Sequence, residues 1–149
     1  MDPEKRDRWS SNMPKVSVVI PAYNAMTYLP ETVESVLKQT FTNFEVLIIN
    51  DGSSDHIMQW VTEISDSRVR LISQENQGLP GARNTGIAQA QGEYVAFLDA
   101  NDWWEPTKLE KQVRCFEERP SVGLVYTWTA LINASRQPNG RLYQTRSIY

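Results

Sequence analysis

The stretch that decides the fold is Val95-Ala96-Phe97-Leu98-Asp99-Ala100-Asn101-Asp102, in which a short apolar run ends abruptly in polar and acidic residues. Two earlier stretches have the same form: Val16-Ser17-Val18-Val19-Ile20-Pro21-Ala22-Tyr23-Asn24 and Val46-Leu47-Ile48-Ile49-Asn50-Asp51-Gly52-Ser53-Ser54-Asp55. Short apolar runs bounded by turn residues are typical of buried strands. Each strand then carries polar groups at its carboxyl end, which is where open α/β sheets bind ligands.

Helical patterns alternate with strand patterns along the rest of the chain. Apolar residues at helical spacing predict helices at about residues 30–39, 56–64, 80–91 and 105–119. Strands are predicted at about residues 16–20, 44–49, 69–72, 94–98 and 122–128, with the last near a sheet edge. This alternation with short links predicts a three-layer, Rossmann-like α/β fold with a mostly parallel sheet. The turn-rich segment at 133–140 is compatible with a hairpin.

Length and charge restrict the class of protein. The chain has 149 residues and a formal net charge of −3, which fits one domain and argues against nucleic acid as a partner. We expect residues 1–14 to be a disordered or loosely attached lead-in and residues 15–149 to form the domain. No apolar stretch approaches the roughly 20 residues that cross a bilayer, and the lead-in lacks a signal-peptide core. We therefore expect a cytoplasmic protein, at most peripheral to a membrane.

Several familiar site types are excluded by residue spacing. The glycines form neither GxGxxG nor GxxxxGK[ST], which argues against a dinucleotide dehydrogenase and a P-loop enzyme. Cys115 and His56 are the only residues of their kinds, so they cannot build a zinc site of His and Cys ligands.

Asp51 ends the second buried run and is a candidate ligand-binding residue. In a doubly wound sheet it would lie beside the end of the first strand, where it could accept hydrogen bonds from a base or ribose. Pro21-Ala22-Tyr23 would form the neighbouring wall. Two simpler interpretations stay open: a strand-to-helix turn with a capping residue at 51–55, and a packing role for Tyr23.

A second candidate cluster follows the strand at 94–98. Asp99 and Asn101 are two residues apart, which on an extended segment points both side chains the same way. Their oxygens could hold Mg²⁺ or Mn²⁺ while the ion bridges two phosphates. Arg83 lies among small residues in the third predicted helix, where it could contact a phosphate or form a salt bridge.

Together with Gly78-Leu79-Pro80-Gly81-Ala82-Arg83-Asn84, these stretches make the chain resemble family 2 glycosyltransferases of the GT-A fold, from about Pro14 to Ala134. The resemblance implies that a nucleotide sugar, the donor substrate, binds here. The donor-binding residues implied by it are Pro21, Ala22, Tyr23, Asp51, Arg83, Asp99 and Ala100.

The resemblance also implies an Asp-x-Asp metal site for Mg²⁺ or Mn²⁺ at Asp99 and position 101. The family pattern usually has aspartate at position 101, where this chain has Asn101. A neutral amide oxygen would weaken the site, and Asp102 would compensate if the loop turns.

The activity implied is inverting transfer of a sugar, from a UDP-sugar, to an acceptor hydroxyl on a polysaccharide or lipid-linked glycan. Family members carry an acceptor-binding half with the general base, and nothing after Tyr143 supplies one, so we expect the donor-binding half of a larger enzyme. No residue is predicted as the base. One alternative is a non-catalytic nucleotide-binding or interaction module of the same fold. Another, a sugar-nucleotide pyrophosphorylase, is disfavoured because Pro21-Ala22-Tyr23-Asn24 replaces its glycine-rich opening.

Overall fold

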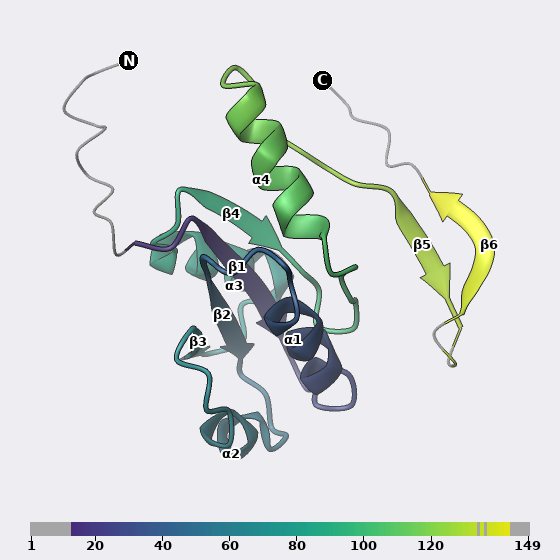
Figure 1. Ribbon diagram of the computed structural model, residues 1–149. Helices are drawn as coiled ribbons and strands as arrows, with labels where there is room; N and C mark the ends of the chain where they lie inside the picture. The colour runs from purple at the N-terminus through teal and green to yellow at the C-terminus, as the bar shows by residue number, and fades with distance from the viewer. Residues whose placement is uncertain (1–12, 134, 136, 144–149) are drawn as a thin grey trace. The chain divides into compact units, whose positions relative to one another are not determined.

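The computed structural model describes residues 13–133, 135 and 137–143 (Figure 1). Residues 1–12 of the expected lead-in lie outside the described residues. The chain divides into two compact units after Lys108, and each unit is described by itself.

The first unit is built on a parallel sheet with the strand order β3-β2-β1-β4. Its strands are β1 (Val16–Ala22), β2 (Phe44–Asp51), β3 (Val69–Gln74) and β4 (Tyr94–Phe97). In the registers of the sheet, Ala22 lies opposite Asn50 and Val19 lies opposite Phe97. Every residue of β1 and β2 is buried, as expected for central strands of a sheet covered on both faces. The predicted parallel α/β sheet is therefore confirmed.

Three helices of the first unit connect the strands: α1 (Leu29–Leu37), α2 (Ile57–Thr62) and α3 (Gly78–Gln89). The ribbon shows α1 and α3 on opposite faces of the sheet (Figure 1). Small residues let α3 approach β1 closely, because a Cβ on Gly86 would lie only 2.2 Å from Cγ1 of Val19. Ala82 joins the same core cluster, which also contains Leu47 and Ile49. The small residues of this helix thus serve its close packing against the sheet.

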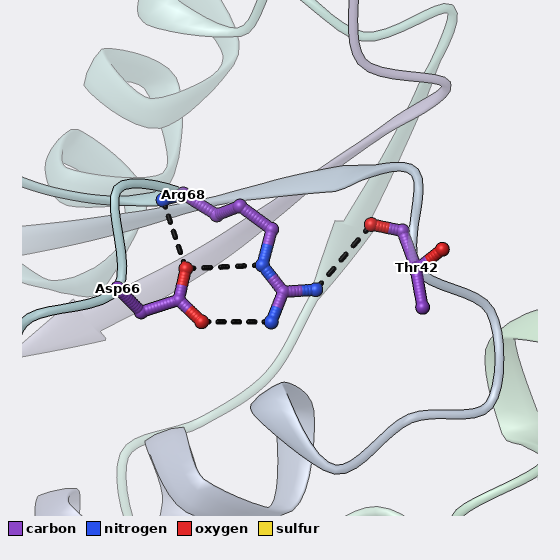
Figure 2. A network of polar contacts seen from close by, with 3 residues as sticks. All are labelled: Thr42, Asp66 and Arg68. Carbon is purple, nitrogen blue, oxygen red and sulfur yellow. Dashed lines mark hydrogen bonds and ion pairs between the residues drawn. The ribbon is translucent and has the colours of Figure 1, made fainter.

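The connection from α2 to β3 is held by Asp66 and Arg68. The guanidinium donates to both carboxylate oxygens of Asp66, from Nε at 3.0 Å and from a terminal nitrogen at 2.8 Å. Figure 2 shows the other terminal nitrogen reaching the backbone oxygen of Thr42, at 3.3 Å. The guanidinium also lies over the ring of Phe44, at 4.3 Å from its centroid. This contact set ties the start of β3 to the start of β2.

The second unit begins with α4 (Lys108–Glu118) and ends in a two-stranded antiparallel sheet. The strands are β5 (Thr129–Ile132) and β6 (Pro138–Tyr143), so the turn-rich segment does lie in a hairpin. The strand predicted at 122–128 is wrong, because these residues form no regular structure. Pairing defines a strand, and β6 pairs only with 129–132. Leu124 and Trp128, whose pattern suggested burial in a sheet, are 77% and 58% exposed.

No helix among the described residues has both the length and the apolar composition that a membrane-crossing helix needs.

Candidate functional site

The sheet order brings the polar ends of three strands to one edge. From β1 the chain moves outward to β2 and β3, and it then returns to the other side of β1 to form β4. The point between β1 and β4 is the topological switch point, where doubly wound sheets bind ligands. Tyr23, Asp51 and Asp99 follow or end the strands at this edge, as the sequence pattern predicted.

The predicted wall residues lie where β1 passes into the first loop at this edge. Pro21 and Ala22 are buried in β1, whereas the side chain of Tyr23 is 57% exposed. The next residue, Asn24, has a positive φ of 48°, which turns the chain sharply. An exposed ring beside a sharp turn leaves Tyr23 open to a ligand, and burial of its side chain in the core is excluded.

The loops after β1 and β2 are joined by hydrogen bonds. The backbone N–H of Asn24 donates to Oγ of Ser53 at 3.0 Å, and Oδ1 of Asn24 accepts from the N–H of Ser54 at 2.8 Å. Asp55 bridges in the same way, because it accepts from the N–H of Met26 at 3.1 Å and from the N–H of Ile57 at 3.3 Å. The N-cap position of α2 is His56, which makes no side-chain cap hydrogen bond, so the cap predicted at 53–55 is wrong. Asp55 instead joins the two loops through its bonds to Met26 and Ile57.

Asp51 is a buried carboxylate, with 3% of its surface exposed. Its Oδ1 accepts from Nε2 of Gln74 at 2.7 Å and from the backbone N–H of Gln77 at 2.9 Å. Oε1 of Gln74 is buried and has no hydrogen-bond partner among the described residues. Gln74 and Gln77 were not predicted as site residues, because their proximity to Asp51 comes from the pairing of β2 with β3.

Arg83 forms an ion pair with Asp99, with 2.9 Å between the guanidinium and Oδ1. The guanidinium lies 5.9 Å from the ring centroid of Phe97, and its Nε is buried without a hydrogen-bond partner in the described part of the chain. Of the two functions left open for Arg83, the salt bridge is present. The phosphate contact stays a prediction.

Residues 99–102 form a turn. The backbone N–H of Asp102 donates to the backbone oxygen of Asp99 at 2.9 Å, with Ala100 and Asn101 between them. The expectation that Asp99 and Asn101 share one side of an extended segment is therefore wrong, because the chain leaves the extended conformation directly after Asp99. The loop does turn at Asp102, which was the condition for that residue to take part.

The turn carries two carboxylates, Asp99 and Asp102. Partial burial raises the pKa of Asp102, and the negative charge of Asp99 adds to this increase. Two nearby carboxylates are acceptors only, so they suit a cation placed between them. They also lie at the end of β4, beside the switch point.

The donor set fits Mg²⁺ or Mn²⁺ shared with a phosphorylated ligand. Such ions are often held by one or two carboxylates, and oxygens of substrate phosphates complete the coordination. Asp99, Asp102 and the amide oxygen of Asn101 offer this kind of partial set. A group of three His, Cys, Asp or Glu side chains able to hold a metal without a ligand's help does not occur among the described residues.

Comparison with known proteins identifies the family of this chain. The family model for glycosyl transferase family 2 matches residues 17–146. A relative from Escherichia coli, the UDP-Glc:alpha-D-GlcNAc-diphosphoundecaprenol beta-1,3-glucosyltransferase WfgD, is 46% identical over 99 residues. That match covers 66% of this chain, and the chain spans only 39% of the relative's length.

Solved structures share the architecture described above. Staphylococcus aureus TarS in complex with UDP-GlcNAc has a TM-score of 0.67 and 26% identity, over 79% of this chain and 40% of that chain. A mannosyltransferase from Pyrobaculum calidifontis in complex with GDP-Man and Mn²⁺ has a TM-score of 0.65 and 25% identity, over 76% of this chain and 35% of that chain. The fold is thus the GT-A type, and the chain belongs to glycosyl transferase family 2.

Proposed function

We propose that this chain is the donor-binding part of an inverting glycosyltransferase that uses a UDP-sugar together with Mg²⁺ or Mn²⁺. The acceptor is a hydroxyl of a polysaccharide or a lipid-linked glycan. Family membership and the UDP-sugar named for the E. coli relative support this donor class. The main observation in support of the proposal is that Asp51 is a buried carboxylate at the carboxyl end of β2.

Asp51 is prepared to accept a hydrogen bond from a nucleoside. Its Oδ1 already accepts two hydrogen bonds, from Gln74 and Gln77, which fix the orientation of the carboxylate. No described residue donates to Oδ2, and that oxygen is the one we assign to an N–H of the base. Tyr23 lies at the adjacent strand end, where its exposed ring forms the wall of the same site.

The acidic turn after β4 is assigned to the diphosphate and its cation. Asp99 and Asp102 supply charged oxygens, and Asn101 supplies a neutral one. Arg83, which pairs with Asp99, carries the positive charge closest to this turn and is assigned to a phosphate oxygen of the donor. A bound cation would neutralise the charge that develops on the departing diphosphate. The acceptor hydroxyl then displaces the diphosphate at the anomeric carbon with inversion.

Calorimetry of UDP binding with Mn²⁺ tests the assignment of Asp51. The Asp51→Asn variant keeps the shape of the side chain and an oxygen for Gln74 and Gln77. It places an NH₂ donor where the base would need an acceptor, so we expect UDP affinity to fall about ten- to a hundredfold. The matched control is Glu93→Gln, which removes one negative charge at the opposite, amino-terminal edge of the sheet, where Glu93 pairs with Lys15.

The control variant should bind UDP within about twofold of the wild type, because surface charges far from a site have small effects. Equal affinity in the Asp51→Asn variant would remove Asp51 from the nucleoside site. Absence of UDP binding by the wild-type chain would contradict the proposed function itself.

A further inference from the structure

One face of α1 is both polar and buried. Thr32, Ser35 and Gln39 are spaced by three and four residues, so they lie on the same side of the helix and its C-terminal extension. Only 1%, 8% and 4% of their respective surfaces are exposed. The same helix also buries the apolar side chains of Leu29, Val33 and Val36, but these do not explain why three polar side chains are buried beside them. Buried polar groups need hydrogen-bond partners, and the identity of these partners is informative.

Two of the bonds stay within α1 and its C-terminal extension: the hydroxyl of Ser35 donates to the carbonyl oxygen of Thr32 at 2.7 Å, and Nε2 of Gln39 donates to that of Ser35 at 3.3 Å. In addition, all three side chains bond to backbone groups of one loop, residues 100–106. The hydroxyl of Thr32 lies 3.0 Å from the carbonyl oxygen of Ala100 and 2.8 Å from that of Asp102, so its single proton is within hydrogen-bond distance of both oxygens. Oγ of Ser35 accepts from the N–H of Trp104 at 3.1 Å.

The same pattern continues toward the end of the loop. Nε2 of Gln39 donates to the carbonyl oxygen of Glu105 at 2.8 Å, and the N–H of Thr40 donates to that of Pro106 at 2.9 Å. Every one of the bonds to the loop is made with its backbone. The helix therefore fixes the path of the loop whatever side chains the loop carries.

This loop begins with the acidic turn assigned above to the diphosphate and its cation. The two carbonyl oxygens that Thr32 contacts belong to the residues on either side of Asn101. The turn is also closed by its own bond between the N–H of Asp102 and the carbonyl of Asp99. Thr32 therefore contacts the backbone of the same turn that carries the residues assigned to the cation.

Holding this turn requires a constraint from outside it. Two like charges at its ends, Asp99 and Asp102, repel each other, and the turn on its own would relieve this repulsion by opening. The hydroxyl of Thr32 and the acceptor of Ser35 oppose that opening, because an open turn would leave buried polar groups without partners.

We propose that Thr32, Ser35 and Gln39, here called the α1 polar face, are positioning residues that set the geometry of the metal-binding turn. The proposal rests on the proposed function, since it takes Asp99 and Asp102 as the residues that meet the cation. The α1 polar face touches neither nucleotide nor cation. It acts on the cation through the backbone of residues 100–106.

The test compares Thr32→Val with Thr32→Ser in the full chain. Valine keeps the shape of threonine but removes the hydroxyl, whereas serine keeps the hydroxyl. The matched control is Thr62→Val, because Thr62 also donates its hydroxyl to a backbone carbonyl, that of Gln59 at 2.7 Å, but does so within α2 and at an exposed position. Calorimetry measures UDP affinity with and without excess chelator, a Mn²⁺ titration of the UDP complex measures Mn²⁺ affinity, and electron paramagnetic resonance reports the coordination symmetry of bound Mn²⁺.

We expect Thr32→Val to weaken Mn²⁺ binding to the UDP complex by about tenfold. This is the lower end of the roughly 10- to 100-fold loss that follows removal of a group that orients metal ligands. UDP affinity in chelator should stay within about twofold, because the α1 polar face does not reach the nucleoside wall. The Mn²⁺ spectrum should change in Thr32→Val only. Thr32→Ser and Thr62→Val should match the wild type in all three measurements.

Three results would overturn the proposal. One is a Thr32→Val variant that is less stable in urea but binds Mn²⁺ with wild-type affinity and spectrum, which would make the α1 polar face structural only. Another is an equal loss of UDP affinity with and without metal. The third is a wild-type chain that binds UDP without any response to Mn²⁺, which would contradict the metal site but leave the Asp51 site standing.

A second variant covers the case in which Thr32→Val does not fold. Ser35→Ala removes the acceptor for the N–H of Trp104 and leaves the hydroxyl of Thr32 in place. We expect the same metal-specific loss, and an unchanged metal response in this variant would likewise overturn the proposal.

Discussion

At the scale of single residues, Arg83 and Asp99 share one ion pair, which a bound donor would have to rearrange. The guanidinium occupies Oδ1 of Asp99, the carboxylate assigned to the cation. A cation that arrives alone would compete with Arg83 for this oxygen. A cation that arrives on a diphosphate brings phosphate oxygens to which Arg83 can turn instead. We therefore expect the metal to bind this chain mainly as a complex with the nucleotide.

We predict that position 101 sets how strongly the free chain holds the metal. Asn101 is exposed in the turn and adds no charge, so wild-type protein should bind Mn²⁺ weakly without UDP. Asn101→Asp should tighten Mn²⁺ binding about tenfold, because a carboxylate replaces a neutral oxygen between two others. Titration of Mn²⁺ with and without UDP, on both proteins, measures this change.

The control for this prediction is Asn43→Asp, which adds the same charge just before β2, at the amino-terminal edge of the sheet. It should leave Mn²⁺ affinity unchanged. An Asn101→Asp variant that gains no more than this control would mean that residue 101 does not face the ion.

Residues at the strand ends could be predicted, and their supporting partners could not. Asp51 and Asp99 follow apolar runs, so their places at one sheet edge follow from strand order alone. Gln74 and Thr32 carry no such local signal. Thr32 meets Ala100 across 68 positions of sequence, and only the packed fold brings the two together. The turn at 99–102 escaped prediction for the same reason, since its conformation is fixed by α1 from outside.

At the scale of elements, a partner strand separates the correct strand predictions from the wrong one, since the four-residue β4 was predicted correctly and the seven-residue pattern at 122–128 was not. The strands at 16–22 and 44–51 are long, apolar and buried along their whole length, so composition alone identifies them. Residues 122–128 mix exposed aromatic and aliphatic side chains around Gly123, and the antiparallel partner of the actual strand begins only at Pro138. Strand propensity alone selected the wrong segment, because it does not say which segment has a strand to pair with.

The turn between α2 and β3 should contribute a pH-dependent part of the stability. The hydrogen bonds from Arg68 hold the pKa of Asp66 below its ordinary value of 3.8, although slight burial opposes this decrease. A lowered carboxylate pKa stabilises the fold above the unfolded value and loses this effect as pH falls through the folded value. Asp66→Asn should therefore lower the free energy of unfolding by about 1 kcal/mol near neutral pH. Urea unfolding of both proteins, from neutral to acid pH, measures the difference.

That difference should shrink once the pH falls below 3.8, the ordinary value for the carboxyl group. The control is Glu63→Gln, which removes an exposed carboxylate at the end of α2 that has no ion-pair partner among the described residues. It should change the unfolding free energy little at any pH. A difference for Asp66→Asn that stays constant into acid would show that its ion pair with Arg68 does not stabilise the fold.

At the scale of the whole molecule, the proposed donor site fits within this chain, whereas the relatives in the family are much longer than the chain. The parts assigned to the donor lie within the first unit, from the wall at β1 to the turn after β4. The chain spans 39% of the E. coli relative and 40% of the TarS chain. The sequence could predict the donor side because its motifs are short and local. It offered no pattern for an acceptor site or a general base.

We therefore predict that these 149 residues bind a UDP-sugar without transferring the sugar to an acceptor in multiple turnovers. Proximity supplies about 7–11 kcal/mol of catalysis only when both reactants are held, and no residue here is assigned to the acceptor or to its deprotonation. Slow donor hydrolysis is the most we expect. A discontinuous assay with several UDP-sugars and a broad acceptor panel, at high protein concentration, measures glycoside product. Multiple-turnover transfer that Asp99→Ala abolishes would contradict this prediction and would place a complete active site within the chain.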